Sequence, residues 1–136
     1  MGLRVLLDTN AYAALFRGDA GVAARIRSAE QVLLSTVVAG ELLFGFRNGS
    51  RYESNRRDLD SFLANPYVSL LPVTLVTADR FGRIAAALKR KGRPLPTNDI
   101  WIAAHAMESG AELLSFDRHF AEVDGLAWVD PAAGSA

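Results

Sequence analysis

The chain has 136 residues, enough for one compact domain with a sizeable core and too few for a second domain. Basic and acidic residues number 15 each, so the net charge is zero and no overall basic field attracts nucleic acid. There is no cysteine, which excludes disulfides, zinc–thiolate sites and thiol catalysis. The first apolar run is too short for a signal peptide, and the longest, interrupted by Glu41, is too short to span a membrane. These features predict a cytoplasmic protein without membrane contact.

Short apolar runs bounded by polar residues predict strands, because the runs are too short for helices. In chain order, the expected strands cover residues 3–7, 32–35, 68–73, 112–115 and 126–129. Apolar side chains three and four residues apart predict helices over residues 20–29, 36–48, 52–64, 77–91 and 98–109. Strands that alternate with helices indicate an α/β fold with a parallel sheet covered on both faces. We expect a single domain over residues 1–131 and a frayed tail of small residues over 132–136.

Two aspartates follow predicted strands. Asp8 comes directly after the first strand, and Asp117 lies two residues beyond the strand at 112–115. In open parallel sheets, ligands bind beyond the carboxyl ends of the strands, so both aspartates are candidate site residues. A structural alternative stays open for each, because Asp8 could cap a helix and Asp117 could close its strand with an Asx-turn.

Two further carboxylates lie on predicted helices. Glu41 falls within the apolar stripe of the helix at 36–48, one turn from Val37 and Val38. An unpaired carboxylate is costly to bury, so a core-facing glutamate either protonates or meets a cation, which favours a functional role. Asp99 lies in the first turn of the helix at 98–109, where the helix dipole alone would favour a carboxylate.

Together, these four carboxylates are expected to converge on one cleft, because they lie at strand ends or on helices that start near them. Carboxylates so close would repel one another and raise each other's pKa values unless a divalent cation neutralised them. Oxygen ligands without cysteine or paired histidine favour Mg²⁺ or Mn²⁺ over zinc. Since Mg²⁺ commonly bridges to substrate phosphates, the pattern predicts phosphodiester chemistry.

Four short motifs, LLDTN, GELLFG, NDIWIAA and LLSFDRHF, occur in this order and are followed by GLAWV. In this order and spacing they resemble the PIN domain family, and most of all the VapC-type toxins of bacterial toxin–antitoxin pairs. The resemblance implies a PIN-like three-layer α/β/α fold with a central, mainly parallel sheet of about five strands. It also implies a catalytic, metal-binding set of Asp8, Glu41, Asp99 and Asp117, supported by the polar residues Thr9, Asn10, Asn98 and Ser115.

The resemblance implies a metal-dependent endoribonuclease, the toxin of a type II toxin–antitoxin system, that cleaves RNA with Mg²⁺ or Mn²⁺. Such proteins are usually homodimers, and a small antitoxin wraps the toxin and occludes its site. Hydrolysis by metal-activated water requires nothing of the RNA 2′-hydroxyl. We therefore expect products with a 5′-phosphate and a 3′-hydroxyl.

Basic and aromatic residues are the next candidates for RNA and partner contacts. Possible RNA contacts are the run Lys89, Arg90, Lys91 and Arg93 near a helix end, and Arg118 beside Asp117. Cations also favour helix C-termini for purely structural reasons. His105 and His119 are expected to pack or lie in a turn and not to act as bases. Phe44, Phe46 and Trp101 either pack in the core or form an apolar groove for a partner helix.

A different class of protein remains as an alternative, namely a Mg²⁺-binding signalling or partner-binding α/β module without nuclease activity. A phosphoacceptor receiver domain needs an adjacent acidic pair early in the chain and a lysine after a late strand. Here the first strand ends in a single aspartate followed by Thr9 and Asn10, and the late strand ends in SFDRH. These differences favour the nuclease.

Overall fold

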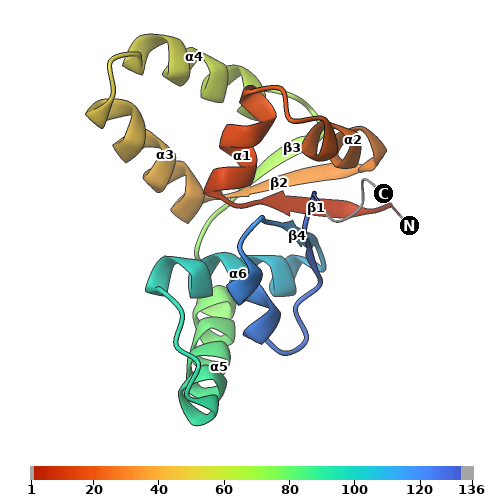
Figure 1. Ribbon diagram of the computed structural model, residues 1–136, viewed down its shortest axis with the longest axis vertical. Helices are drawn as coiled ribbons and strands as arrows, with labels where there is room; N and C mark the ends of the chain where they lie inside the picture. Colours follow the sequence, from red (N-terminus) through yellow and green to blue (C-terminus); the bar gives the residue numbers. More distant parts are fainter. Residues whose placement is uncertain (1, 133–136) are drawn as a thin grey trace.

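Five short strands pair in parallel as the central sheet, in the order β3-β2-β1-β4-β5 (Figure 1). The protein is seen here in a computed structural model that describes residues 2–132. The strands are β1 (Arg4–Leu7), β2 (Gln31–Ser35), β3 (Val68–Leu71), β4 (Glu112–Leu114) and β5 (Trp128–Val129). The predicted parallel sheet of about five strands is confirmed. Of the expected tail at 132–136, residues 133–136 lie outside the described part of the chain.

The central strand is β1, and it determines where the site forms. Val5, Leu6 and Leu7 are completely buried, because β1 has a strand on each side and helices cover both faces of the sheet. Leu7 pairs with Leu34 of β2 on one side and with Leu114 of β4 on the other. The residues that follow these three strands therefore meet at one edge of the sheet, where the strand order changes direction.

The helices form the two outer layers. They are α1 (Thr9–Phe16), α2 (Ala20–Ser28), α3 (Thr36–Asn48), α4 (Tyr52–Leu63), α5 (Leu75–Lys91) and α6 (Thr97–Ser109), with a short 3-10 helix, η1 (Arg118–Glu122). Figure 1 shows α1 and α2 on one side of the sheet, and α6 with α5 beyond it on the other. The predicted α/β/α arrangement is confirmed. Among the described residues, no helix is long and apolar enough to cross a membrane.

The predicted elements differ from the structure in a few places. Helices α1 and η1 were not expected, because each is short. Each is capped by an aspartate, Asp8 or Asp117, that we interpreted mainly as a site residue. Helix α5 begins at Leu75, two residues before the expected start. The third strand ends at Leu71 and not at 73, because Pro72 has no N–H to continue the ladder. The last strand covers only two residues, Trp128 and Val129.

His105 of α6 is completely buried, as expected of a packing residue, and its ring forms hydrogen bonds outside its own helix. Its Nδ1 lies 2.8 Å from Ser35 Oγ, and its Nε2 lies 3.0 Å from the Pro72 carbonyl oxygen. A carbonyl can only accept, so Nε2 donates to it, and Nδ1 of the neutral ring then accepts from the Ser35 hydroxyl. His105 thus joins α6 to the end of β2 and the loop after β3.

Replacing His105 by leucine is expected to lower the free energy of unfolding by about 2–4 kcal/mol, because Ser35 and the Pro72 carbonyl would lose buried partners. Urea denaturation measures the effect. The matched control is His119→Leu, whose exposed side chain should change stability by only about 0.5 kcal/mol. Equal stability of the two variants would contradict a structural role for His105.

Candidate active site

Asp8 follows the central strand and is 7% exposed. Its Oδ1 accepts a hydrogen bond from the Ala11 backbone N–H at 2.8 Å, which caps α1, and its Oδ2 accepts one from the Ser115 hydroxyl at 2.5 Å. Burial raises the pKa of Asp8, these two hydrogen bonds offset part of the rise, and the charges of Asp117 and Glu41 add to it. Asp8 therefore caps α1, as the structural alternative predicted, and it also lies near the carboxylates of Asp117 and Glu41.

Ser115 lies directly after β4 and is completely buried. While its hydroxyl donates to Asp8, the same oxygen accepts the backbone N–H of Asp117 at 3.0 Å. The indole Nε1 of Trp128, on the neighbouring strand β5, donates to the Ser115 backbone carbonyl at 2.9 Å. Ser115 thus fixes the carboxylate of Asp8, which follows β1, and the backbone of Asp117, which follows β4.

Glu41 comes from α3 and is half-buried. The hydroxyl of Thr9 donates to its Oε1, and the side-chain amide of Asn98 donates to its Oε2 at 3.2 Å. Two of the expected supporting residues therefore orient this carboxylate. Asn10 is exposed, and its side chain makes no hydrogen bond within the described residues.

Asp99 lies in the first turn of α6, as expected, and is half-buried. Burial, followed by the charges of Asp117, Glu41 and Asp8, raises its pKa to about 6, although the nearby His119 lowers it slightly. Since all three other carboxylates act on Asp99, the four expected site residues lie in one electrostatic cluster. We call Asp8, Glu41, Asp99 and Asp117 the acidic cluster.

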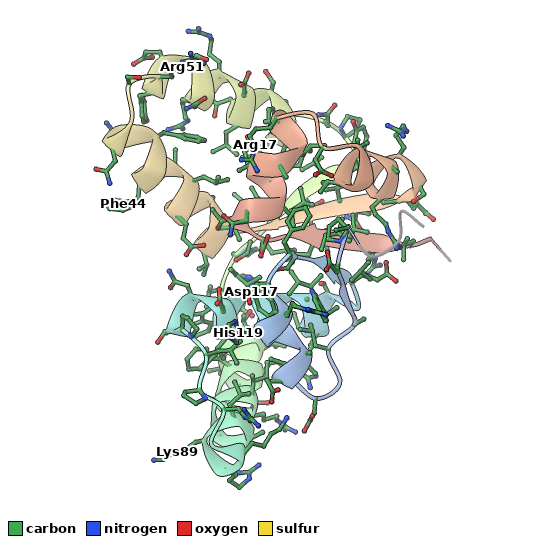
Figure 2. The ribbon with its side chains drawn as sticks, viewed as in Figure 1. Arg17, Phe44, Arg51, Lys89, Asp117 and His119 are labelled. Carbon is green, nitrogen blue, oxygen red and sulfur yellow. The ribbon has the colours of Figure 1, made fainter. Side chains whose placement is uncertain are left out.

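Asp117 caps the N-terminus of η1 and forms the Asx-turn that we considered. Its Oδ1 accepts from the backbone N–H of His119 at 2.9 Å and lies 2.8 Å from the ring Nδ1 of the same residue. The His119 side chain is otherwise exposed, which agrees with its expected place in a turn. Figure 2 shows Asp117 and His119 below the sheet, beside the start of α6.

The acidic cluster can be tested for its fit to a metal ion. Within residues 2–132, no three His, Asp or Glu side chains are arranged so that one ion could bind to all of them. The donors are nevertheless all oxygens. Besides burial, the charges of neighbouring carboxylates raise the pKa values of Asp8 and Asp99, a repulsion that a divalent cation would relieve. Because Mg²⁺ retains several water ligands, one or two direct carboxylates are sufficient. The residues fit a hydrated hard cation.

The expected RNA-contacting residues differ in their distance from the acidic cluster. Figure 2 shows Lys89 at the end of α5, far from Asp117. Lys91 Nζ donates to the Glu122 carbonyl at 2.7 Å and lies 3.2 Å from Asp124 Oδ1, and Arg93 Nε lies 3.8 Å from Glu122 Oε2. Only Arg118, exposed and adjacent to Asp117, lies beside the cluster. RNA contact by the 89–93 run therefore requires an RNA long enough to reach the end of α5.

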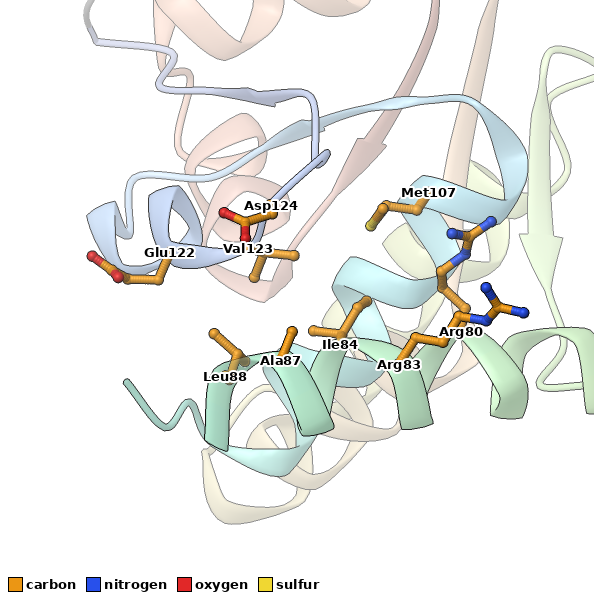
Figure 3. Close-up of a pocket in the computed structure, with 9 residues that line it drawn as sticks. All are labelled: Arg80, Arg83, Ile84, Ala87, Leu88, Met107, Glu122, Val123 and Asp124. Atoms are coloured by element: carbon orange, nitrogen blue, oxygen red, sulfur yellow. The ribbon is translucent and has the colours of Figure 1, made fainter. Parts of the chain in front are cut away.

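A separate cavity of about 150 Å³ lies between α5, α6 and the segment after η1 (Figure 3). Its floor is apolar, and two arginines face two carboxylates across it. The lining residues are Arg80, Arg83, Ile84, Ala87, Leu88, Met107, Glu122, Val123 and Asp124. No residue of the acidic cluster lines it, so this cavity is not the site of the chemistry that the sequence indicates.

The sequence did not indicate two features of the site. Trp128 supports the backbone of Ser115 through its indole N–H, and the partner atom is a carbonyl, which every residue carries. From the sequence, Trp128 was assigned to a strand and to the GLAWV motif, but not to the support of the site. The three aromatics that were expected either to pack in the core or to form a groove also differ from one another: Trp101 stacks on Phe81 with ring centroids 4.1 Å apart, and Phe46 packs against the core, whereas Phe44 is 70% exposed.

The fold and the converging carboxylates define the class of protein as an α/β domain with an acidic site at the carboxyl edge of its parallel sheet. The chain belongs to the PIN domain family, because the model of the PIN domain matches residues 5–126. The resemblance stated from the motifs is thus confirmed over nearly the whole chain.

Relatives of the chain are ribonucleases. Ribonuclease VapC1 of Haemophilus influenzae (strain R2866) is 28% identical over 130 residues, which cover 92% of this chain and 96% of the relative. The tRNA(fMet)-specific endonuclease VapC of Shigella flexneri is 29% identical over 131 residues, which cover 94% and 98%. Among solved structures, VapBC-1 from nontypeable Haemophilus influenzae superposes with a TM-score of 0.84 and 27% identity, and covers 96% of this chain and 99% of that one.

Proposed function

We propose that this PIN domain is a Mg²⁺- or Mn²⁺-dependent endoribonuclease, the toxin of a toxin–antitoxin pair that acts in the cytoplasm. The observation that carries the proposal is the acidic cluster itself. Four carboxylates from both ends of the chain meet at one edge of the sheet. Burial and the charges of the other three carboxylates raise the pKa of Asp99 to about 6. Such repulsion is a cost to the fold, which is expected where the carboxylates serve a cation and a phosphate.

A bound divalent cation would stabilise the negative charge that develops on the phosphate and lower the pKa of water. Asp8 and Asp99 would hold the cation, with Glu41 and Asp117 as further oxygen donors. Ser115 keeps Asp8 oriented, and Thr9 with Asn98 keeps Glu41 oriented. The supporting hydrogen bonds thus fix the carboxylates before RNA arrives.

The expected reaction is hydrolysis of an RNA phosphodiester bond by water. Water attacks phosphorus in line, the P–O3′ bond breaks, and the leaving oxygen takes a proton to become a 3′-hydroxyl. The phosphate stays attached to the 5′ oxygen of the downstream fragment, which therefore has a 5′-phosphate end. Since the 2′-hydroxyl takes no part, no cyclic phosphate forms.

The test uses the purified chain, freed of any partner, on total cellular RNA with Mg²⁺ or Mn²⁺ and with chelator. Asp8→Asn is the test variant, because asparagine also caps helices and α1 should remain folded. We expect cuts at a few defined sites, with 5′-phosphate ends, that disappear in chelator and in the variant. Absence of cleavage with either metal, or equal cleavage by the variant, would overturn the proposal.

We further propose that an antitoxin segment occupies a hollow between α1, α3 and α4. The hollow is lined by Tyr12, Ala13, Phe16, Arg17, Leu42, Phe46, Arg51, Ser54, Asn55 and Asp58. Figure 2 shows Arg17 and Arg51 on this side of the molecule. Solved VapBC relatives belong to toxin–antitoxin systems, which supports this kind of partner.

A second copy of the chain is proposed for the apolar surface at the start of α5, where Val73, Leu75 and Val76 are 44%, 85% and 66% exposed. A charge there should prevent association, so Val76→Glu is expected to sediment as a monomer at concentrations where the wild type is a dimer. The control is Lys89→Gln at the other end of α5, which changes the net charge by the same amount. A monomeric wild type, or a dimeric Val76→Glu variant, would contradict the proposed dimer surface.

A further inference from the structure

An open hollow adjoins the acidic cluster on the side of α3. It has a volume of about 570 Å³ and is lined by Thr36, Val37, Gly40, Glu41, Phe44 and Asn98. Glu41 and Asn98, which are hydrogen-bonded to each other, therefore belong both to the hollow and to the site. A volume of this size is within the range of sites that take small ligands. A strand held at the acidic cluster would pass directly into this hollow.

Phe44 is the only aromatic side chain that lines this hollow, among the residues described. It follows Glu41 by three positions on α3, so the two side chains share one face of the helix, one turn apart. Its ring is 70% exposed, whereas Phe46, two residues later, packs against the core. Figure 2 shows Phe44 at the outer side of α3. Phe44 therefore has a free ring face beside the site and little part in the core.

Gly40 keeps the floor of the hollow open. It precedes Phe44 by four residues and Glu41 by one, and a Cβ added to it would meet nothing within 4 Å. Glycine in a helix interior is unfavourable compared with alanine, and no contact in the structure requires glycine here. The missing side chain leaves α3 uncovered beside the Phe44 ring, where a flat group could lie.

We propose that Phe44 stacks against an unpaired base of the RNA, next to the phosphate that is cut. This inference rests on the proposed ribonuclease function. Every base has a π-face that can stack on an aromatic ring, and only unpaired bases leave that face free. Because the hollow shares Glu41 and Asn98 with the acidic cluster, the stacked base belongs to a nucleotide adjacent to the scissile bond. The enzyme therefore takes single-stranded or loop RNA.

The test uses a single-stranded RNA oligonucleotide that spans a cleavage site mapped with the wild type, with 2-aminopurine beside the cut. Binding is measured in the Asp99→Asn background so that the RNA stays intact. Phe44→Ala is expected to weaken RNA binding about tenfold and to abolish the fluorescence quenching that stacking causes. Phe44→Trp should retain both. The control Tyr67→Ala removes a ring that is 50% exposed at the opposite end of the sheet, and it should change neither.

A second pair of variants tests the same hollow without touching the ring. Gly40→Leu should fill the space and weaken RNA binding. The control is Gly82→Leu on α5, where an added Cβ also meets nothing within 4 Å, and it should bind RNA normally. In the active enzyme, kcat/KM of Phe44→Ala should fall about tenfold, mainly through KM.

Unchanged affinity and quenching in Phe44→Ala would overturn the inference. The same holds if Phe44→Ala binds RNA normally but changes the sedimentation of the protein or its affinity for an antitoxin, because Phe44 would then belong to a protein interface. Cleavage by the wild type in the same assay separates this failure from a failure of the ribonuclease proposal.

Discussion

Replacing Asp99 by asparagine is expected to reduce RNA cleavage by about 100- to 1000-fold or more and, without metal, to stabilise the folded protein at pH 8. Burial raises the pKa of Asp99, and the charges of the other three carboxylates add to the rise, to about 6. The unfolded chain has no such surroundings, so its Asp99 ionises near the ordinary value of 3.8. Above pH 6, Asp99 is ionised in both states, and its negative charge costs more free energy in the folded state than in the unfolded state.

The sign of the pH dependence follows from a folded-state pKa above the unfolded one. The contribution of Asp99 to stability is fully present below about pH 4 and is lost as the pH rises through about 6. Asparagine has no such loss. Because Asp99 is half-exposed and partly screened, we expect the variant to be more stable by about 1 kcal/mol at pH 8, with no difference at pH 4.

Urea unfolding in chelator at the two pH values measures this difference. The control is Asp79→Asn, since Asp79 is exposed in the second turn of α5 and pairs with Arg83 at 2.9 Å. That variant should be neutral or slightly less stable at pH 8. A less stable Asp99→Asn variant at pH 8 would mean that the carboxylate supports the fold and is not held against repulsion.

Replacing Ser115 by alanine is the second change with a large expected effect. The buried hydroxyl donates to Asp8 at 2.5 Å and accepts the Asp117 backbone N–H at 3.0 Å, so both groups would lose a buried partner. We expect a loss of about 2–3 kcal/mol of stability and about 10- to 100-fold of cleavage. The loss of cleavage has a separate cause, since Asp8 would lose one of the two hydrogen bonds that orient it.

Two measurements separate these effects. Urea unfolding gives the stability, and initial cleavage rates are compared at a temperature where the variant is fully folded. The matched control is Ser109→Ala in α6, whose hydroxyl donates only to carbonyls of its own helix, at 2.7 Å from the His105 oxygen. It should retain cleavage. Normal cleavage by folded Ser115→Ala would show that Asp8 needs no orienting partner.

Much of the site could be predicted from the sequence, because ligands in open parallel sheets bind beyond the carboxyl ends of the strands. Asp8 and Asp117 come just after strands whose carboxyl ends share an edge, and Asp99 begins a helix that covers the same edge. Their mutual effect on Asp99 agrees with that placement. For Asp8 and Asp117, the sequence presented capping and site membership as alternatives, yet a carboxylate has two oxygens. Asp8 caps α1 with one and accepts the Ser115 hydroxyl with the other, while the charges of Asp117 and Glu41 act on it.

Other features could not be predicted because they depend on contacts between distant residues. Nothing near Trp128 in the sequence indicates that its indole N–H reaches the Ser115 carbonyl. The same is true of Lys91, whose ammonium is held by Glu122 and Asp124, acidic residues 31 and 33 positions away. Phe44 and Phe46 are chemically identical, and only the packing of α3 decides which one is exposed.

The central position of β1 has a consequence for biosynthesis. Its partner β4 and the serine that holds Asp8 come from the last quarter of the chain, 107 positions after Asp8. A growing polypeptide that has left the ribosome only as far as α6 has three of the four carboxylates but neither β4 nor Ser115. The acidic cluster and the serine that supports it therefore cannot assemble before β4 and the residues after it have left the ribosome. The site is completed late in synthesis, after all six helices α1 to α6 have been made.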